Sequence, residues 1–171
     1  TIEVFDDIGP DKSLTFAINA INGFLHAIKM DPKMSLAYLC KMFSVVFCLK
    51  MSSEMPHWIC NRIGELPSED LLKVVPQITA HIDHPDKAIR KMISEILSKL
   101  GEDHFQEIFF PLELYSDDKS SPTRSSIASN ILLSFKHTKP ILYSDADLFT
   151  DGMIRSATTW FESWSSTIEN I

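Results

Sequence analysis

The segment from Leu71 to Leu100, which is followed by Gly101, constrains the fold of this chain most strongly. Its apolar residues recur at spacings of three and four, which places them on one face of each of two helices. The first set comprises Leu71, Val74, Val75, Ile78 and Ile82, and the second comprises Ile89, Met92, Ile93, Ile96, Leu97 and Leu100. Asp83-His84-Pro85-Asp86 separates the sets, because proline opens a helix readily and continues one poorly. The segment therefore predicts an antiparallel helical hairpin that ends at Gly101, a common helix terminator.

The rest of the chain shows the same period, divided by short links that contain proline, glycine or polar residues. We expect residues 1–12 to be a lead-in loop and residues 115–123 to be an exposed loop. Ser13 and Asp103 are expected to cap the starts of two helices. Three further helix starts are expected at proline, in Asp31-Pro32, Ser121-Pro122 and Lys139-Pro140. Within helices, we expect Pro76 to cause a kink or a break and Gly152 not to end the last helix.

Neither helix of the hairpin can bury its apolar face alone, so other helices must cover both. Units of two helices recur about every 35 to 40 residues without clear sequence identity. We therefore expect an all-α fold, namely an α-solenoid of antiparallel helical hairpins of the HEAT or tetratricopeptide kind, with a long C-terminal helix. The residues expected in its core include Phe43, Val46, Ile78, Ile93, Leu97 and Ile131.

Composition narrows the classes of protein to consider. The 171 residues are 44% hydrophobic, which favours a folded chain, and their net charge of −7 argues against binding to nucleic acid or acidic membranes. The most apolar run, Met34 to Leu49, is interrupted by Lys41 and is too short to cross a bilayer, so no transmembrane segment is expected. Three cysteines in apolar surroundings predict reduced core thiols in the cytoplasm or the nucleus. The chain starts at Thr1 without a signal-peptide pattern, and we expect it to be a piece of a longer protein.

No catalytic, cofactor-binding or metal-binding pattern is recognisable. Signatures of nucleotide binding, phosphoryl transfer and nucleophilic serine are missing, and His81 and His84 lack further ligands at zinc spacing. Ser120, Ser121 and Thr123 give only a weak signal for phosphorylation. Trp160 and Trp164 stack on neighbouring turns of one helix, as core residues or as the floor of a binding surface. Burial is the favoured interpretation, because aromatic side chains drive it strongly.

Several short stretches, taken together in chain order, resemble a known family. They are Ala20-Ile21-Asn22-Gly23-Phe24-Leu25, Val75-Pro76-Gln77-Ile78, Ile82-Asp83-His84-Pro85, Phe110-Pro111-Leu112, Lys119-Ser120-Ser121, Ala128-Ser129-Asn130-Ile131-Leu132, Ile154-Arg155 and Trp160-x-x-x-Trp164. This order resembles the C-terminal part of the FAT domain of target-of-rapamycin kinases, which are phosphatidylinositol-3-kinase-related serine/threonine protein kinases. The resemblance runs from near Thr15 to the end of the chain.

The resemblance implies two parts: residues 1–152 as a FAT-type helical-repeat segment, and residues 153–171 as the start of the rapamycin-binding helical bundle. Trp160, Phe161, Trp164 and Ile168 would lie in the first bundle helix as bundle or interface residues. Ile168 would match an apolar residue of the drug-binding surface that is usually leucine. Thr158 and Thr159 depart from the family's aliphatic pair, and rapamycin binding by these residues alone is not implied.

The function implied is that of a non-catalytic helical scaffold that supports and regulates a downstream kinase domain. The segment itself would hold no cofactor, whereas the parent kinase would use ATP and magnesium. Its partners would be the kinase domain and the remaining helical repeats of the same polypeptide, together with protein partners of the parent complex. The expected location is the cytoplasm, with the nucleus as a possible additional location.

Two other interpretations stay open. One is the equivalent segment of another kinase of the superfamily, such as the nonsense-mediated-decay kinase. The other, from a different class, is a free-standing HEAT-like adaptor that binds peptides in a concave groove. An independent small enzyme is the least favoured.

Overall fold

The computed structural model describes the backbone of residues 10–48 and 55–169, and these residues form helices without any strand. The helices are α1 (Pro10–Met30), α2 (Ser35–Cys48), α3 (Met55–Ile63), α4 (Ser68–Leu72), α5 (Val75–Ala80), α6 (Lys87–Asp103), α7 (Phe105–Ser116), α8 (Pro122–Thr138) and α9 (Pro140–Glu169). A short 3-10 turn, Pro32–Met34, joins α1 to α2.

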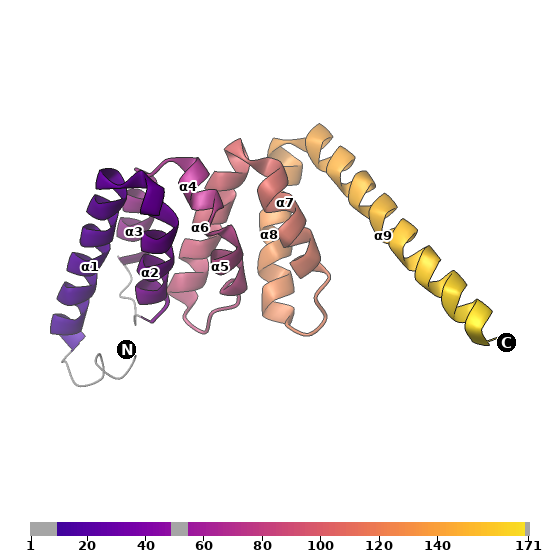
Figure 1. Ribbon diagram of the computed structural model, residues 1–171, viewed down its shortest axis with the longest axis horizontal. Helices are drawn as coiled ribbons and strands as arrows, with labels where there is room; N and C mark the ends of the chain where they lie inside the picture. Colours follow the sequence, from indigo (N-terminus) through magenta and orange to yellow (C-terminus); the bar gives the residue numbers. More distant parts are fainter. Residues whose placement is uncertain (1–9, 49–54, 170–171) are drawn as a thin grey trace.

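The helices α1 to α8 stand side by side in two layers, and α9 leaves the array at an angle (Figure 1). Helices α3, α6 and α8 follow one another in one layer, where α6 contacts both of its neighbours. Helices α2, α5 and α7 lie in the other layer, and α1 packs against α2 at the N-terminal end. This arrangement confirms the prediction of an all-α solenoid of helical hairpins with a long C-terminal helix.

One continuous core runs between the two layers. The six residues expected there are all buried: Phe43, Val46, Ile78, Ile93, Leu97 and Ile131. Each comes from an apolar position at helical spacing, and the two layers cover the faces that single helices cannot bury.

Proline and capping residues begin several helices where the sequence indicates. The Asp31 carboxylate accepts a hydrogen bond from the Lys33 backbone N–H, and Ser121 does the same for Arg124 at the start of α8. The last helix begins at Pro140. Pro76 is the second residue of α5, and Lys73 and Val74 separate this helix from α4. The expected break at Pro76 is therefore confirmed.

Other boundaries differ from the prediction. Helix α6 runs past Gly101 to Asp103, so Gly101 does not end it and Asp103 does not cap α7. The reason for the glycine is packing: a Cβ at Gly101 would lie 2.1 Å from Cζ of Phe135 in α8. Helix α1 begins at Pro10 rather than after Ser13, since proline suits the first turn. Helix α7 continues through Ser116, which shortens the expected loop of residues 115–123.

Candidate functional site

The first half of α9 is anchored on α7 and α8 by aromatic side chains. The Tyr143 ring meets the Phe109 ring edge to face, with 5.5 Å between the ring centroids, and the Lys136 ammonium lies over the Tyr143 ring, 5.6 Å from its centroid. Phe149 lies beside Phe110 at 6.4 Å. Ala146 completes this docked face on the next turn. Spacings of three and four place these residues on one side of α9.

The same side of α9 continues beyond Thr150 without a partner among the described residues. Met153 is 59% exposed, Trp164 is 65% exposed and Ile168 is 67% exposed. Figure 1 shows why: α9 diverges from the solenoid, so its C-terminal half lies far from α7 and α8. An apolar face that is buried at one end and bare at the other is typical of an interaction surface.

Four residues of this region were singled out by the sequence: Trp160, Phe161, Trp164 and Ile168. All four belong to the uninterrupted helix α9. The interpretation of the tryptophans as buried core is wrong for Trp164, because this side chain is 65% exposed. The side chains of Trp160 and Phe161 lie outside the described residues. A role for the four in a bundle or interface stays a prediction.

A shallow hollow lies over Gly152, next to this side of the helix and sharing Phe149 and Met153 with it. Its lining residues are Asp145, Leu148, Phe149, Gly152, Met153 and Ser156. Gly152 lies inside α9, and nothing is within 4 Å of the position that a Cβ would take. The helix passes through this residue without ending, as expected.

Carboxylates gather where α9 leaves the solenoid. Burial raises the pKa of Glu113 in α7, and the nearby charges of Asp147, Asp117 and Asp151 raise it further. Burial, then Glu113 and Asp147, also raises the pKa of the Tyr143 hydroxyl. The Glu113 Oε2 atom is buried without a hydrogen-bond partner. The ionised form of Glu113 is therefore unfavourable here, and the first turns of α9 are electrostatically strained against α7.

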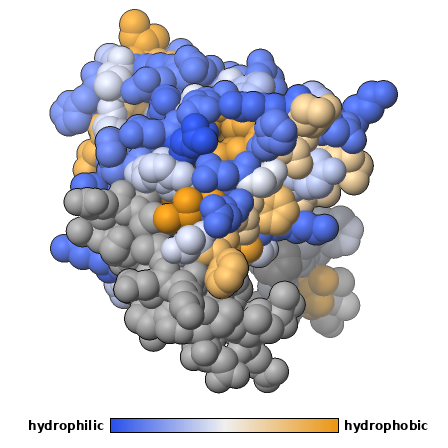
Figure 2. Space-filling model, turned by 90° about the vertical axis from the view of Figure 1, so that its left-hand side faces the viewer, coloured by the Kyte–Doolittle hydropathy of each residue, from blue (hydrophilic) through white to orange (hydrophobic). Residues whose placement is uncertain are grey.

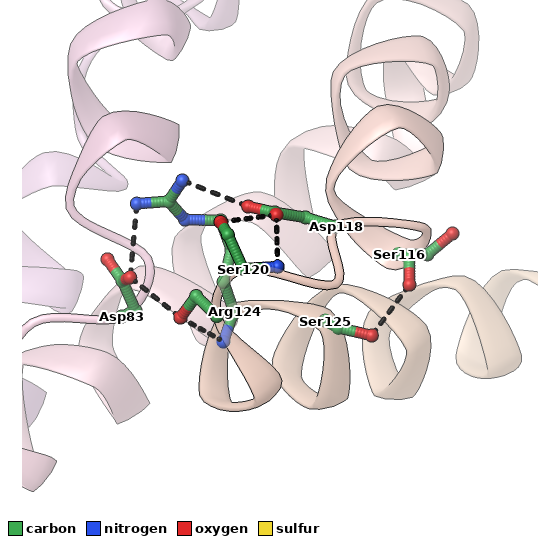
Figure 3. A network of polar contacts seen from close by, with 7 residues as sticks. Asp83, Ser116, Asp118, Ser120, Arg124 and Ser125 are labelled. Carbon is green, nitrogen blue, oxygen red and sulfur yellow. Dashed lines mark hydrogen bonds and ion pairs between the residues drawn. The ribbon is translucent and has the colours of Figure 1, made fainter.

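A second polar cluster fastens neighbouring hairpins to each other (Figure 3). Arg124 of α8 pairs with Asp83, from the turn before α6, at 3.0 Å, and with Asp118 at 3.3 Å. The Ser121 hydroxyl donates to Asp83 at 3.0 Å. The Arg124 guanidinium also lies over the Tyr115 ring, 5.2 Å from its centroid. The cluster is thus a structural joint between hairpins.

The same contacts lower the pKa values of two carboxyl groups in the joint, those of Asp83 and Asp118. Burial alone would raise the pKa of Asp83, but the hydrogen bonds from Ser121 and Arg124 outweigh it and lower this pKa. The Ser120 hydroxyl donates to Asp118, whose pKa is lowered mainly by Ser120. Of the three residues with a weak phosphorylation signal, Ser121 is therefore engaged in the joint, while Ser120 and Thr123 are exposed.

The histidine pair of the hairpin has a packing role. Nδ1 of His84 accepts a hydrogen bond from the Asp86 backbone N–H, which leaves Nε2–H to donate to the Phe47 carbonyl at 3.1 Å. The His81 ring packs 4.2 Å from the Phe47 ring, and burial lowers the pKa of His81. No group of three or more metal-type ligands occurs in residues 10–48 and 55–169.

A cavity of about 350 Å³ lies between α3 and α6. Ile63, Leu66 and Ile96 contribute to its apolar lining, and Cys60 contributes a thiol. Burial and a hydrogen bond to Glu95 raise the pKa of Cys60 to about 12, so this thiol stays protonated and unreactive at neutral pH. Cys40 and Cys60 are half-buried, but Cys48 is exposed, so the expectation that all three are core thiols is wrong for Cys48.

Comparison with known proteins gives a consistent result. No family model matches the chain. Over 154 residues, 90% of the chain, it is 26% identical to the serine/threonine-protein kinase tor1 of Schizosaccharomyces pombe. It is also 26% identical to the serine/threonine-protein kinase TOR2 of Saccharomyces cerevisiae over 86% of the chain, and to the serine/threonine-protein kinase mTor of Drosophila melanogaster over 90%.

These relatives are much longer than the chain, which spans 6–7% of their lengths. The chain is thus similar along most of its length to one segment of target-of-rapamycin kinases, which confirms the resemblance found in the sequence. The position of that segment within a FAT domain stays a prediction. Among the helices that the structure describes, none combines the length and the apolarity that a bilayer crossing requires.

Proposed function

We propose that the chain is a non-catalytic helical scaffold segment of a large target-of-rapamycin-like serine/threonine kinase, and that it supports and regulates the kinase domain downstream. The similarity to three such kinases over 86–90% of the chain supports this proposal. A solenoid suits the role, because stacked hairpins give an extended and rigid frame on which another domain can rest.

The main structural support for this proposal is the exposed apolar side of the C-terminal half of α9. Its apolar side continues the side that α7 and α8 cover, and Trp164 and Ile168 are both more than half exposed. Helices that follow in the polypeptide would bury this side, as the helices of a bundle bury each other's apolar stripes. In this view, residues 1–152 are the FAT-type segment and residues 153–171 begin the rapamycin-binding bundle, so the domain boundary falls inside α9.

The remaining properties follow from the same proposal. ATP and magnesium would bind to the kinase domain of the parent protein and not to this segment. The partners would be that kinase domain, the other helical repeats of the polypeptide and the protein partners of the parent complex. Such a protein would work in the cytoplasm, or in the nucleus as well.

Two isoleucines of α9 provide the test. Ile168 lies on the bare side and is 67% exposed, whereas Ile141 is 79% exposed in the first turn. In the complete polypeptide, Ile168→Ser should lower kinase activity and make the chain after α9 more sensitive to protease, because it weakens the docking of the next helices. Ile141→Ser is the matched control and should change neither. Equal effects of the two variants, or none from Ile168→Ser, would contradict the proposal.

The coding sequence beyond Ile171 separates the rival interpretations. Catalytic-loop and magnesium-binding signatures of a protein kinase a few hundred residues downstream would support the parent kinase. A stop codon directly after Ile171 would favour the free-standing adaptor instead.

A further inference from the structure

The turn between α7 and α8 carries a serine hydroxyl at the exposed end of a chain of polar contacts (Figure 3). Ser120 is exposed, and its hydroxyl and its backbone N–H both donate to Oδ1 of Asp118, at 2.5 Å and 2.8 Å. Oδ2 of Asp118 accepts a hydrogen bond from Arg124 at 3.3 Å, and Arg124 pairs with Asp83 at 3.0 Å. Asp83 lies in the turn before α6. The contacts therefore connect an exposed hydroxyl to the neighbouring hairpin.

The ion pairs of this joint are better shielded from water than the pair at the N-terminal end of the solenoid. The side-chain exposures in the joint are 27% for Arg124, 25% for Asp83 and 21% for Asp118. In the pair between α1 and the turn after α3, Lys29 is 56% exposed and Glu65 is 44% exposed. Figure 2 views that end, where hydrophilic side chains cover much of the described surface. Because less water surrounds the joint, a charge added there should act more strongly.

The joint contains more negative than positive charge. Both Asp83 and Asp118 pair with the single guanidinium of Arg124. The Nε atom of Arg124 is buried and has no hydrogen-bond partner within the described parts of the chain. A phosphoserine side chain carries a charge of about −1.5 to −2 at neutral pH, and phosphate binds guanidinium groups through paired hydrogen bonds. A phosphate beside Arg124 would therefore compete with both carboxylates for this side chain.

We propose that Ser120 is a phosphorylation site and that its phosphate weakens the joint between the hairpins. A protein kinase would transfer the γ-phosphoryl group of ATP to Oγ of Ser120. The new O–P bond forms while the bond from the γ-phosphorus to the bridging oxygen breaks, a base of that kinase takes the hydroxyl proton, and ADP leaves. The inference goes beyond the proposed function and does not depend on it, because it concerns contacts within this chain.

The phosphate changes each contact along the chain in turn. Phosphorylated Ser120 has no hydroxyl hydrogen to donate to Asp118, and its charge repels this carboxylate. The same charge attracts Arg124, which then leaves Asp83. The apolar contact between Phe135 and Gly101 is unchanged, so the two hairpins should loosen at their turns without unfolding.

The neighbouring hydroxyl groups suit this role less well. Ser121 is half-buried, because its hydroxyl donates to Asp83 and accepts from the Arg124 backbone N–H. Thr123 is exposed in the first turn of α8, where a phosphate would stabilise the helix. Ser120 combines an accessible hydroxyl with a direct contact to the joint.

The test compares the chain phosphorylated at Ser120, by phosphoserine introduced during synthesis, with the unmodified chain. Phosphate at Ser120 should lower the melting temperature by roughly 2–4 °C at neutral pH. Amide hydrogens of the turn before α6 should exchange roughly fivefold faster. Phosphate at Ser126, an exposed position of α8, is the matched control and should change neither. Ser120→Ala removes the hydroxyl without adding charge and should lower the melting temperature by less than the phosphate does.

Asp83→Asn reports whether Arg124 has left Asp83. The substitution should lower the melting temperature of the unmodified chain and have little further effect after phosphorylation of Ser120. An undiminished effect in the phosphorylated chain would show that the ion pair persists and would overturn the proposal. So would a higher melting temperature on phosphorylation, or equal changes from phosphate at Ser120 and at Ser126.

Use of the site is measured on the complete polypeptide isolated from its own cells. Mass spectrometry of peptides that span the turn should locate phosphate on Ser120. Phosphate confined to Ser121 or Thr123, or no phosphate in the turn in either growing or starved cells, would overturn the assignment. Neither measurement depends on kinase activity of the polypeptide, whose absence would count against the proposed function alone.

Discussion

The contact between α6 and α8 can be compared with the C-terminal half of α9. In both regions the helices carry apolar residues at helical spacing, but only the α6–α8 contact buries them. Between α6 and α8, the Phe135 ring fills the space over Gly101, and in the joint Arg124 pairs with Asp83 at 3.0 Å. In α9, Trp164 and Ile168 are mostly exposed. Helical spacing therefore gives a helix an apolar side, whereas contact with a neighbouring helix makes that side part of the core.

The largest expected contrast is between a buried isoleucine of α6 and an exposed isoleucine of α9. Ile93→Ala should lower the free energy of unfolding by about 2–5 kcal/mol, because Ile93 is fully buried and truncation leaves a cavity. Ile141→Ala, in the exposed first turn of α9, should change it by less than about 0.5 kcal/mol. Urea unfolding of the two variants measures both. A change below about 0.5 kcal/mol for Ile93→Ala would mean that the face of α6 is misassigned.

Two glycines give the next contrast, and here the expected signs are opposite. Gly101→Ala should destabilise the chain by about 1–2 kcal/mol. The new methyl group would overlap the Phe135 ring, and the free-energy cost of this overlap should exceed the gain in helix propensity. Gly152→Ala in α9 should stabilise it by about 0.5–1 kcal/mol, because the space there is open. Thermal unfolding decides. A stabilising Gly101→Ala would show that Phe135 moves aside without cost.

The pH dependence should also have opposite signs at the joint and at the base of α9. Because contacts lower the pKa of Asp83 below its ordinary 3.8, the joint stabilises the fold above that pH and loses this contribution as the pH falls through the folded-state pKa. Because burial raises the pKa of Glu113 above 4.5, stability at the base of α9 is lost as the pH rises from 4.5 through the raised pKa.

Two isosteric variants check these signs. Asp83→Asn should cost roughly 1 kcal/mol at neutral pH, since it weakens partly buried charged contacts, and the cost should vanish in acid. Glu113→Gln should raise the melting temperature by roughly 1–2 °C at neutral pH and have no effect in acid. Melting curves from acid to neutral pH measure both variants. A cost of Asp83→Asn that persists in acid would show that its effect is not electrostatic.

The smallest effect on stability is expected for Trp164→Ser. This side chain is 65% exposed, so the melting temperature of the 171-residue chain should not change. Self-association of the chain should decrease, because exposed apolar surface favours association. Sedimentation velocity at several concentrations measures the association. Outright unfolding would instead make Trp164 part of the core and would contradict a bundle role for the end of α9.

Much of the fold could be predicted from residues close together in the chain. Spacings of three and four located the helices, and Asp31-Pro32, Ser121-Pro122 and Lys139-Pro140 marked three of their starts. The break near Pro76 follows from the missing N–H of proline, which is a local property. The core positions Phe43, Ile78 and Ile93 followed from the same spacing and are buried.

Where a distant residue takes part, local signals were misleading. Gly101 has the sequence signature of a helix end, but α6 continues because the glycine accepts the Phe135 ring from another helix. Asp83 and Arg124 meet only because two hairpins stack, and no sequence spacing indicates this ion pair. For Trp164, aromatic character favoured burial, yet the direction in which α9 leaves the solenoid exposes it.

From the sequence alone we could predict that this chain is all-helical, that its hairpins stack into a solenoid, and that it resembles a segment of target-of-rapamycin kinases. These properties depend on periodicity, on capping residues and on the order of short motifs. Which apolar sides become core and which stay at the surface follows only from the packing of the helices: the C-terminal half of α9 carries Trp164 and Ile168 at helical spacing, yet both are more than half exposed. Burial depends on the presence of a second surface at contact distance, and a helix cannot encode its neighbour in its own spacing.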